Sequence, residues 1–210
     1  MATVIGINGS PRKNRNSAIM LDHALQGAAS AGAQVERFDL TDLNFSGCKS
    51  CFACKRIGGK SFGRCALRDE LTDVLDKILN ADAVIISTPI YFGDVPGMVR
   101  NLFERIWFPA LLYSKDGSIA YTKRVKVGLI YTMGMPDTAY YKNLTDSHMG
   151  TFNAFLGETT MVSTNETWQY DNYDLYVGEF NMDVKRRFRE EVFPEDCKKA
   201  FEMGARLAQK

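Results

Sequence analysis

The chain alternates short apolar runs with amphipathic helical patterns, and this alternation constrains its fold more than any other feature. The clearest apolar run is 83–88, which is rich in β-branched residues and carries no charge. Other strand-like runs lie at 4–8, 34–40, 125–133 and 159–164. Apolar strands that alternate with helices indicate a parallel sheet that is covered on both faces.

Helices are expected between these strands and after the last one. The first is expected to begin at Asn16 or Ser17, which are good N-cap residues, and to end before Gly32. Further helices are expected around 71–79, 98–106 and 145–157. A final helix is expected to open at Pro194 and to run to the C-terminus. The predicted fold class is therefore α/β, a flavodoxin-like three-layer sandwich with a five-stranded parallel sheet of order 2-1-3-4-5.

Two segments do not follow the alternation. Residues 44–66 are expected to form a cysteine-rich loop, because they hold four of the five cysteines. Residues 168–193 form an aromatic-rich excursion, which is expected to pack over the sheet edge or to contact another subunit. No internal repeat or linker divides the chain, so residues 1–210 are expected to form a single domain.

Composition and charge argue against several classes of protein. The 26 basic and 25 acidic side chains give a net charge of +1, which favours neither a nucleic-acid partner nor an anionic membrane surface. No apolar run approaches the roughly 18 residues of a membrane-spanning helix, and no signal peptide is visible at the N-terminus. We therefore expect a cytoplasmic protein, in which thiols stay reduced and a disulfide framework is not expected.

Ligands of open α/β sheets bind beyond the carboxyl ends of the strands, at the point where the strand order reverses. In the predicted order, the loops 9–17, 88–97 and 133–137 meet there. The first loop combines hydroxyls, an amide and a guanidinium with a helix N-terminus, and this combination favours a phosphate group. Neither the Rossmann dinucleotide fingerprint nor a complete Walker A loop is present.

The other two loops are apolar at positions where loops are normally polar. Residues 88–97 contain two prolines, two glycines and two aromatic residues, and residues 131–136 are also apolar and contain glycine. A flat apolar ring could lie against them, with backbone amides meeting its polar edge. One phosphate loop beside two such apolar loops describes a mononucleotide with a large planar ring, such as FMN.

Four segments carry a family resemblance: VIGINGSPRKNRNS, STPIYFGDVPGMVRNLFERI, GCKSCFACK…GRCALRDEL and PEDCKKAFEMGARL. They resemble the NADPH-dependent FMN reductase and iron–sulfur flavoprotein group of the flavodoxin-like fold. The resemblance implies an FMN-binding domain that holds the flavin non-covalently and accepts two electrons from NADH or NADPH. It also implies a homodimer or homotetramer in which the flavin lies near a subunit boundary.

The resemblance also implies which residues hold the cofactor. The phosphate would be held by Ser10, Arg12, Asn16 and Ser17. The ring system would be held by Pro89, Ile90, Tyr91, Phe92 and Gly93, with Thr132, Met133 and Gly134 on another side. Arg15 departs from the family pattern, in which this position often carries a small residue.

A C-x2-C-x2-C motif begins at Cys48 and continues with Cys51 and Cys54. This spacing can place three thiolates around an iron–sulfur cubane, and Cys65 is the candidate fourth ligand. The gap between Cys54 and Cys65 is longer than in the family's cluster motif. Three interpretations are open: a [4Fe–4S] cluster, a thiol-rich structural loop without metal, and structural zinc on four cysteines. Cys197 is expected to be an ordinary buried residue.

Basic side chains surround this motif, at Lys49, Lys55, Arg56, Lys60 and Arg64. They would lower thiol pKa values and favour an anionic cluster. They would equally attract the phosphates of a nicotinamide cofactor, and a run of solvated surface charge is the third interpretation.

No catalytic acid or base is assigned, because in hydride transfer to a flavin the cofactor does the chemistry. His23 and His148 are expected at the surface or in packing. Backbone amides of residues 88–97 and 132–135 are expected to stabilise negative charge on the reduced ring.

The expected function is that of an FMN-dependent NAD(P)H oxidoreductase. It would pass electrons to a small acceptor such as a quinone, a free flavin, or a nitro or azo compound. The alternative is an iron–sulfur flavoprotein that relays electrons between protein partners such as ferredoxin. A binding or regulatory module without turnover is a third hypothesis.

Overall fold

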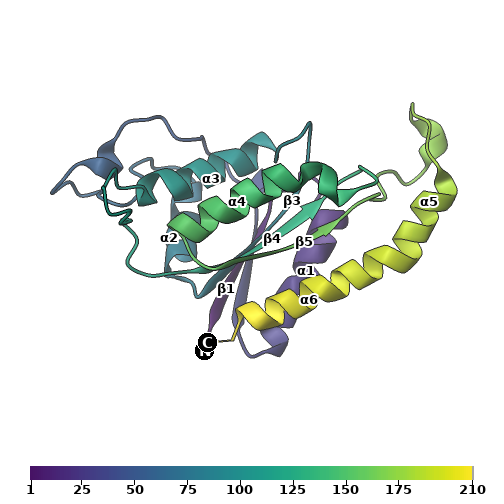
Figure 1. Cartoon of the computed structure of the whole chain (residues 1–210), viewed down its shortest axis with the longest axis horizontal. Coiled ribbons are helices and arrows are strands. Elements are labelled where there is room, and N and C mark those ends of the chain that lie inside the picture. The colour runs from purple at the N-terminus through teal and green to yellow at the C-terminus, as the bar shows by residue number, and fades with distance from the viewer. Residues whose placement is uncertain (210) are drawn as a thin grey trace.

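A parallel sheet lies between two layers of helices in the computed structural model, which describes residues 1–209 (Figure 1). Its strands are β1 (Thr3–Asn8), β2 (Gln34–Asp39), β3 (Ala83–Pro89), β4 (Lys126–Thr132) and β5 (Thr159–Thr164). Their order is β2-β1-β3-β4-β5, and each neighbouring pair is parallel. This confirms the predicted fold class and strand order.

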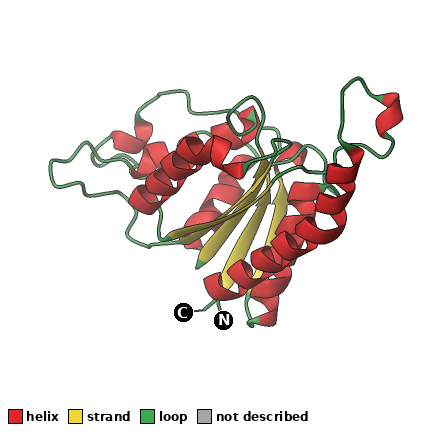
Figure 2. Ribbon diagram, turned by 45° about the vertical axis from the view of Figure 1, so that its right-hand side comes forward, coloured by secondary structure: helices red, strands yellow, loops and turns green. Residues whose placement is uncertain are grey.

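The helices that cover the sheet are α1 (Asn16–Ser30), α2 (Leu71–Asn80), α3 (Gly97–Ala110), α4 (Lys142–Phe155) and α6 (Phe193–Leu207). Helices α1 and α6 cover one face, and α2, α3 and α4 cover the other (Figure 2). The short helix α5 (Met182–Arg187) and the loop before it project away from the sheet. No helix within residues 1–209 is both long and apolar enough to cross a membrane.

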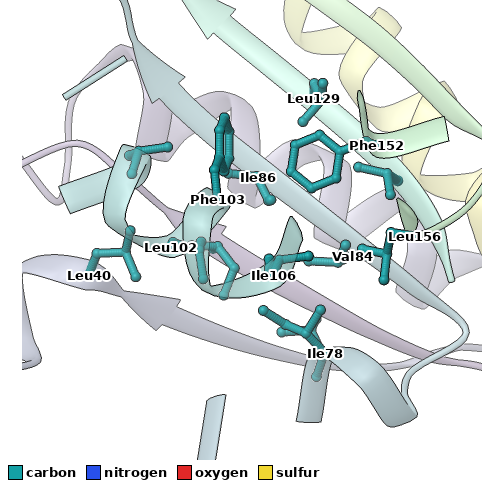
Figure 3. Close-up of a cluster of buried hydrophobic side chains, with 14 of the residues drawn as sticks. Leu40, Ile78, Val84, Ile86, Leu102, Phe103, Ile106, Leu129, Phe152 and Leu156 are labelled. Atoms are coloured by element: carbon teal, nitrogen blue, oxygen red, sulfur yellow. The ribbon is translucent and has the colours of Figure 1, made fainter. Parts of the chain in front are cut away.

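The strands are apolar because both faces of the sheet are buried. Every residue of β3 is buried, and its side chains alternate between the two cores. Val84 and Ile86 face α2, α3 and α4, where the rings of Phe103 and Phe152 meet edge to face at 4.9 Å (Figure 3). Ile85 joins the second core, beneath α1 and α6.

Helices α1 and α6 approach each other closely through glycine. A Cβ atom on Gly27 would lie 1.9 Å from the carbonyl oxygen of Phe201, and one on Gly204 would lie 1.8 Å from that of Ala24. Both distances are far below van der Waals contact. This helix pair therefore requires glycine at both positions.

The C-terminal helical region begins earlier than predicted. It starts at Met182 with α5, passes through a π-helical turn (Phe188–Val192) and continues as α6 from Phe193. Pro194 has no N–H to donate to the preceding turn, which is a physical reason for the irregular hydrogen bonding there. The highly charged residues 182–192 carry no clear apolar periodicity, so the sequence pattern missed this part of the helical region.

Candidate functional site

The three predicted loops meet at the carboxyl edge of the sheet and enclose a cleft. This cleft has about 410 Å³ of empty space and is open to solvent. Its lining residues are Ser10, Arg12, Arg15, Asn16, Ser17, Pro89, Ile90, Tyr91, Thr132, Met133, Gly134, Thr167 and Gln169. Of the residues predicted to hold a cofactor, only Phe92 and Gly93 do not line it.

Hydrogen bonds fix the loop that follows β1. The amide of Asn8 donates to Asp39 Oδ1 at 2.6 Å, and Asn8 Oδ1 accepts from the backbone N–H of Ser10 at 3.1 Å. Ser10 Oγ in turn accepts from the backbone N–H of Arg12 at 3.2 Å. The loop therefore holds the hydroxyl of Ser10 and the guanidinium of Arg12 on the cleft wall, beside the N-terminus of α1.

The predicted N-cap residues of α1 have other partners. The helix begins at Asn16 with Arg15 at the N-cap, and no side chain caps it. Asn16 Nδ2 donates to the carbonyl of Trp168 at 2.8 Å, and Ser17 Oγ lies 2.8 Å from Thr132 Oγ1. Only one hydrogen is used between those two hydroxyls, so the other remains available to a ligand in the cleft.

The start of the aromatic-rich excursion forms a fourth wall of the cleft. The sequence analysis did not predict this wall. We call residues 167–171 the strap. Arg12 Nη1 donates to the carbonyl of Gln169 at 2.6 Å, and Arg15 forms an ion pair with Asp171. This pair raises the pKa of Arg15 and lowers the pKa of Asp171. The strap thus occupies the donors of the predicted phosphate loop with carbonyl and carboxylate oxygens.

A tight turn shapes the loop that follows β3. Tyr91 and Asp94 exchange two backbone hydrogen bonds, at 2.7 and 3.1 Å, around Phe92 and Gly93, which both have positive φ. The N–H of Ile90 donates to the carbonyl of Thr132 at 2.9 Å. Within residues 1–209, the amides of Phe92 and Gly93 make no hydrogen bond, so they are available to a ligand.

Phe92 combines a fully exposed ring with an unfavourable backbone conformation. The side chain is fully exposed, and its φ of 51° is costly for a residue with a Cβ atom. No packing within the described chain compensates for that conformation. Such strain at the rim of a cleft is typical of a functional site.

The loop that follows β4 offers fewer amides than predicted. The N–H of Met133 already donates to the carbonyl of Thr164 at 3.0 Å. Gly134 and Met135 keep amides without a partner among the described residues. Gly134 is also close to the strap, since a Cβ atom there would lie 2.8 Å from Gln169 Nε2.

A buried polar group lies near the loop that follows β3, since His148 Nε2 is 3.8 Å from Asp94 Oδ1. Tyr131 Oη lies 3.0 Å from His148 Nδ1, and Arg100 Nη1 lies 3.4 Å from His148 Nε2. Arginine can only donate, so Nε2 accepts and Nδ1 carries the proton that is given to Tyr131. Burial lowers the pKa of His148 to about 4, against a smaller opposing effect of Asp94. The histidine is therefore a neutral packing residue, as the sequence predicts.

The four clustered cysteines line a separate pocket beside α3. Left-handed φ angles at Ser50 and Phe52 let the loop turn sharply between them. Burial raises the pKa of the Cys54 thiol, and the charge of Lys55 opposes that shift. Cys197 belongs to α6 and is buried in the core, as predicted.

The thiols do not converge in the conformation described. No group of three or more His, Cys, Asp or Glu side chains within residues 1–209 is arranged to hold a metal ion. Four thiols around one pocket nevertheless suit the chemistry of an iron–sulfur cluster or of zinc. The three interpretations of this loop therefore stay predictions.

The chain is similar in sequence to a known family of proteins. Residues 2–140 match the family model described as NADPH-dependent FMN reductase. The chain is 38% identical over 102 residues to an iron–sulfur flavoprotein of Archaeoglobus fulgidus, covering 49% of this chain and 47% of that protein. It is 32% identical over 131 residues to iron–sulfur flavoprotein MJ1083 of Methanocaldococcus jannaschii, covering 62% and 61%. The alignments thus span less than two thirds of these curated relatives.

Solved structures share the fold at low sequence identity. An NAD(P)H:quinone oxidoreductase from Methanothermobacter marburgensis superimposes with a TM-score of 0.69 at 17% identity, covering 98% of each chain. An azoreductase from Bacillus anthracis superimposes with a TM-score of 0.66 at 16% identity, covering 98% of this chain and all of that one.

Proposed function

The chain belongs to the NADPH-dependent FMN reductase family, and on this basis we propose that it binds FMN and uses NAD(P)H to reduce a small acceptor. One observation carries the proposal. A single cleft joins a cationic, hydroxyl-lined half to a half made of apolar loop residues, at the strand-order reversal of the sheet.

The cationic half suits the phosphate of FMN. Ser10, Arg12, Asn16 and Ser17 would hold it, helped by the N-terminal dipole of α1. In the structure, Arg12 and Asn16 donate to strap carbonyls, so their donors already face oxygen atoms. A phosphate would compete for those same donors.

The apolar half suits the ring system. Pro89, Ile90, Tyr91, Phe92 and Gly93 would hold one side of it, and Thr132, Met133 and Gly134 would hold another. Bound FMN supplies the hydride-accepting chemistry. The chain contributes orientation, exclusion of water, and unpartnered amides at Phe92, Gly93 and Gly134, which can stabilise negative charge.

The proposed acceptor is a small molecule such as a quinone, a free flavin, or a nitro or azo compound. Proteins with a similar fold include a quinone oxidoreductase and an azoreductase, and this supports the proposed class of acceptor. We propose a single cytoplasmic domain over residues 1–210 that assembles as a homodimer or homotetramer. An apolar groove between α3 and α4, lined by Trp107, Phe108, Leu111 and Phe155, supports such assembly.

The test is an FMN titration of the purified chain followed by steady-state kinetics. We expect saturable FMN binding, and NADH or NADPH oxidation that depends on added quinone, flavin or azo dye. A folded chain that takes up no FMN would remove the proposal. If the chain binds FMN but shows no acceptor-dependent turnover, the proposed cofactor stands and the proposed reaction is wrong.

An electron carrier with an iron–sulfur cluster is the second candidate function. It is favoured by the four cysteines around one pocket and by the relatives named iron–sulfur flavoprotein. Cys48, Cys51, Cys54 and Cys65 would hold the cluster, and ferredoxin is the type of partner that would exchange electrons with it. Iron and zinc analysis after anaerobic purification separates the alternatives, since a [4Fe–4S] cluster requires about four irons per chain.

A further inference from the structure

A basic groove lies between the cysteine loop and α2, and it shares no lining residue with the proposed FMN cleft. Its main part has about 600 Å³ of empty space, open to solvent. A second part of about 550 Å³ borders it, because Arg64, Leu79 and Tyr121 line both. The proposed reductase activity gives no role to this groove.

The groove carries uncompensated positive charge. Lys60, Arg64, Arg68 and Arg105 line its main part, and Asp76 is the carboxylate among its lining residues. Asp76 is paired with Arg64 at 2.5 Å. Lys60 and Arg68 form no hydrogen bond or ion pair with any residue from 1 to 209. Two free cations in a concave site focus a positive potential there.

Hydrogen bonds of Arg105 hold the residues around the groove in place. Its side chain is fully buried, and Nη1 binds Asp69 at 2.5 Å and the carbonyl of Ser46 at 3.2 Å. Nη2 also donates to the carbonyl of Leu67 at 3.4 Å. The two ends of the cysteine loop are thus tied to α3, while Arg105 and Asp69 neutralise each other. The groove's net charge therefore comes from Lys60 and Arg68.

The α2 side of the groove is mixed. Leu75 and Leu79 line it beside Thr72 and Asp76, and the ring of Tyr121, whose hydroxyl donates to the carbonyl of Ile106 at 2.7 Å, adds a further apolar group. A groove that combines free cations with apolar groups suits an organic molecule with an anionic group. Phosphate matches best, since arginine binds it in a bidentate manner and lysine as a point charge.

We propose that the basic groove binds a small molecule bearing a phosphate or diphosphate group, at a site separate from the FMN cleft. Lys60 and Arg68 bind the phosphate. The remainder of the molecule lies against Leu75 and Leu79. Cys65 lines both the groove and the cysteine pocket, so a bound molecule covers this thiol.

The test is calorimetric titration of the FMN-saturated full-length chain with inorganic pyrophosphate. FMN occupies the first loop, so that loop does not contribute. We expect the double variant Lys60→Gln/Arg68→Gln to weaken binding by roughly tenfold or more, because it removes both charge-assisted bonds to the phosphate. The control Lys198→Gln removes an exposed cation of α6 and should leave the affinity unchanged. Equal affinities in the double variant and the wild type would overturn the proposal.

A second variant separates this proposal from the proposed function. If the chain takes up no FMN, the titration is repeated with Arg12→Gln. Loss of pyrophosphate binding in Arg12→Gln, with retention in the double variant, would assign the phosphate to the first loop and overturn the basic groove. The reverse pattern supports the groove whether or not FMN binds.

Alkylation of the cysteines gives an independent readout. Pyrophosphate should slow the labelling of Cys65 by iodoacetamide and leave that of Cys51 unchanged, because Cys51 does not line the groove. Absence of selective protection would contradict the proposed site. NADP⁺ in place of pyrophosphate identifies the source: tighter binding that still requires Lys60 and Arg68 indicates a nucleotide, and equal binding indicates an inorganic anion.

Discussion

Ser10 shows how single residues set the chemistry of the cleft. Its backbone N–H is held by Asn8 and its hydroxyl by the N–H of Arg12, so the side chain has one defined position on the wall. Arg12 and Arg15 lie on the same wall and provide positive charge. A substitution that adds a negative charge at position 10 therefore tests directly whether a phosphate binds there.

We predict that Ser10→Asp weakens FMN binding by at least about tenfold, or ~1.4 kcal/mol, because a carboxylate would repel the phosphate. Flavin fluorescence quenching during titration measures the dissociation constant. The control Ser147→Asp adds the same charge on an exposed part of α4. An unchanged constant for Ser10→Asp would remove Ser10 from the phosphate site.

His148 predicts a pH dependence of stability. Its pKa is lowered to about 4 in the folded protein, from an ordinary 6.5, chiefly by burial. The unfolded chain therefore binds a proton more readily, and folding stability falls as the pH drops from about 6.5 towards 4. At pH 5 the expected loss from this residue is about 1–2 kcal/mol relative to pH 7.

Urea denaturation at pH 7 and pH 5 measures that loss. The variant His148→Gln keeps a polar side chain that does not titrate, so its stability should change less between the two pH values. An identical change in the variant and the wild type would show that other groups cause the pH dependence.

At the scale of elements, the close contact between two helices depends on glycine. The pair α1–α6 depends on glycine at positions 27 and 204, where a side chain would meet backbone atoms. By contrast, a Cβ atom on Gly150 in α4 would meet no other atom within 4 Å. The same substitution should therefore have opposite effects at the two places.

We predict that Gly204→Ala destabilises the protein by about 1–3 kcal/mol, because α6 must move away from Ala24. Gly150→Ala should stabilise it by about 0.5–1 kcal/mol, because alanine favours the helix over glycine and has room there. Midpoints of urea unfolding compare the two variants with the wild type. Equal effects of the same sign would contradict the close contact of α1 and α6.

At the scale of the whole molecule, the proposed FMN cleft and the cavities around the cysteine loop lie in different places. The proposed FMN cleft lies at the carboxyl edge, and the cysteine pocket and the basic groove lie around the cysteine loop. The cleft shares no lining residue with either of the other two. Substitutions around the cysteine loop should therefore leave the cleft largely intact.

We predict that Cys51→Ala leaves FMN affinity within about twofold of the wild type, because distant sites without shared partners act independently. The same flavin titration measures it, and circular dichroism checks that the variant is folded. Complete loss of flavin from a folded Cys51→Ala variant would show that the cysteine loop shapes the cleft.

The local patterns in the sequence predicted much of the fold and the loops that border the cleft. The continuous apolar run at Val84, Ile85 and Ile86 indicated a strand buried on both faces, since this pattern depends only on neighbouring residues. The polar loop from Ser10 to Ser17 indicated a phosphate site for the same reason. The predicted strand order, which follows general rules for parallel strands, placed this loop and the loop after β4 at the same edge of the sheet.

The sequence by itself determined the strands and the chemistry of the three loops, because these properties depend on nearby residues, and general rules for parallel sheets then predicted the strand order. Only the tertiary structure decided what lies opposite them. Arg12 meets Gln169 across 157 positions, and Arg105 holds Asp69 and Ser46 in a buried network. Such contacts depend on where the chain returns in space, and no periodicity or motif spacing records that return.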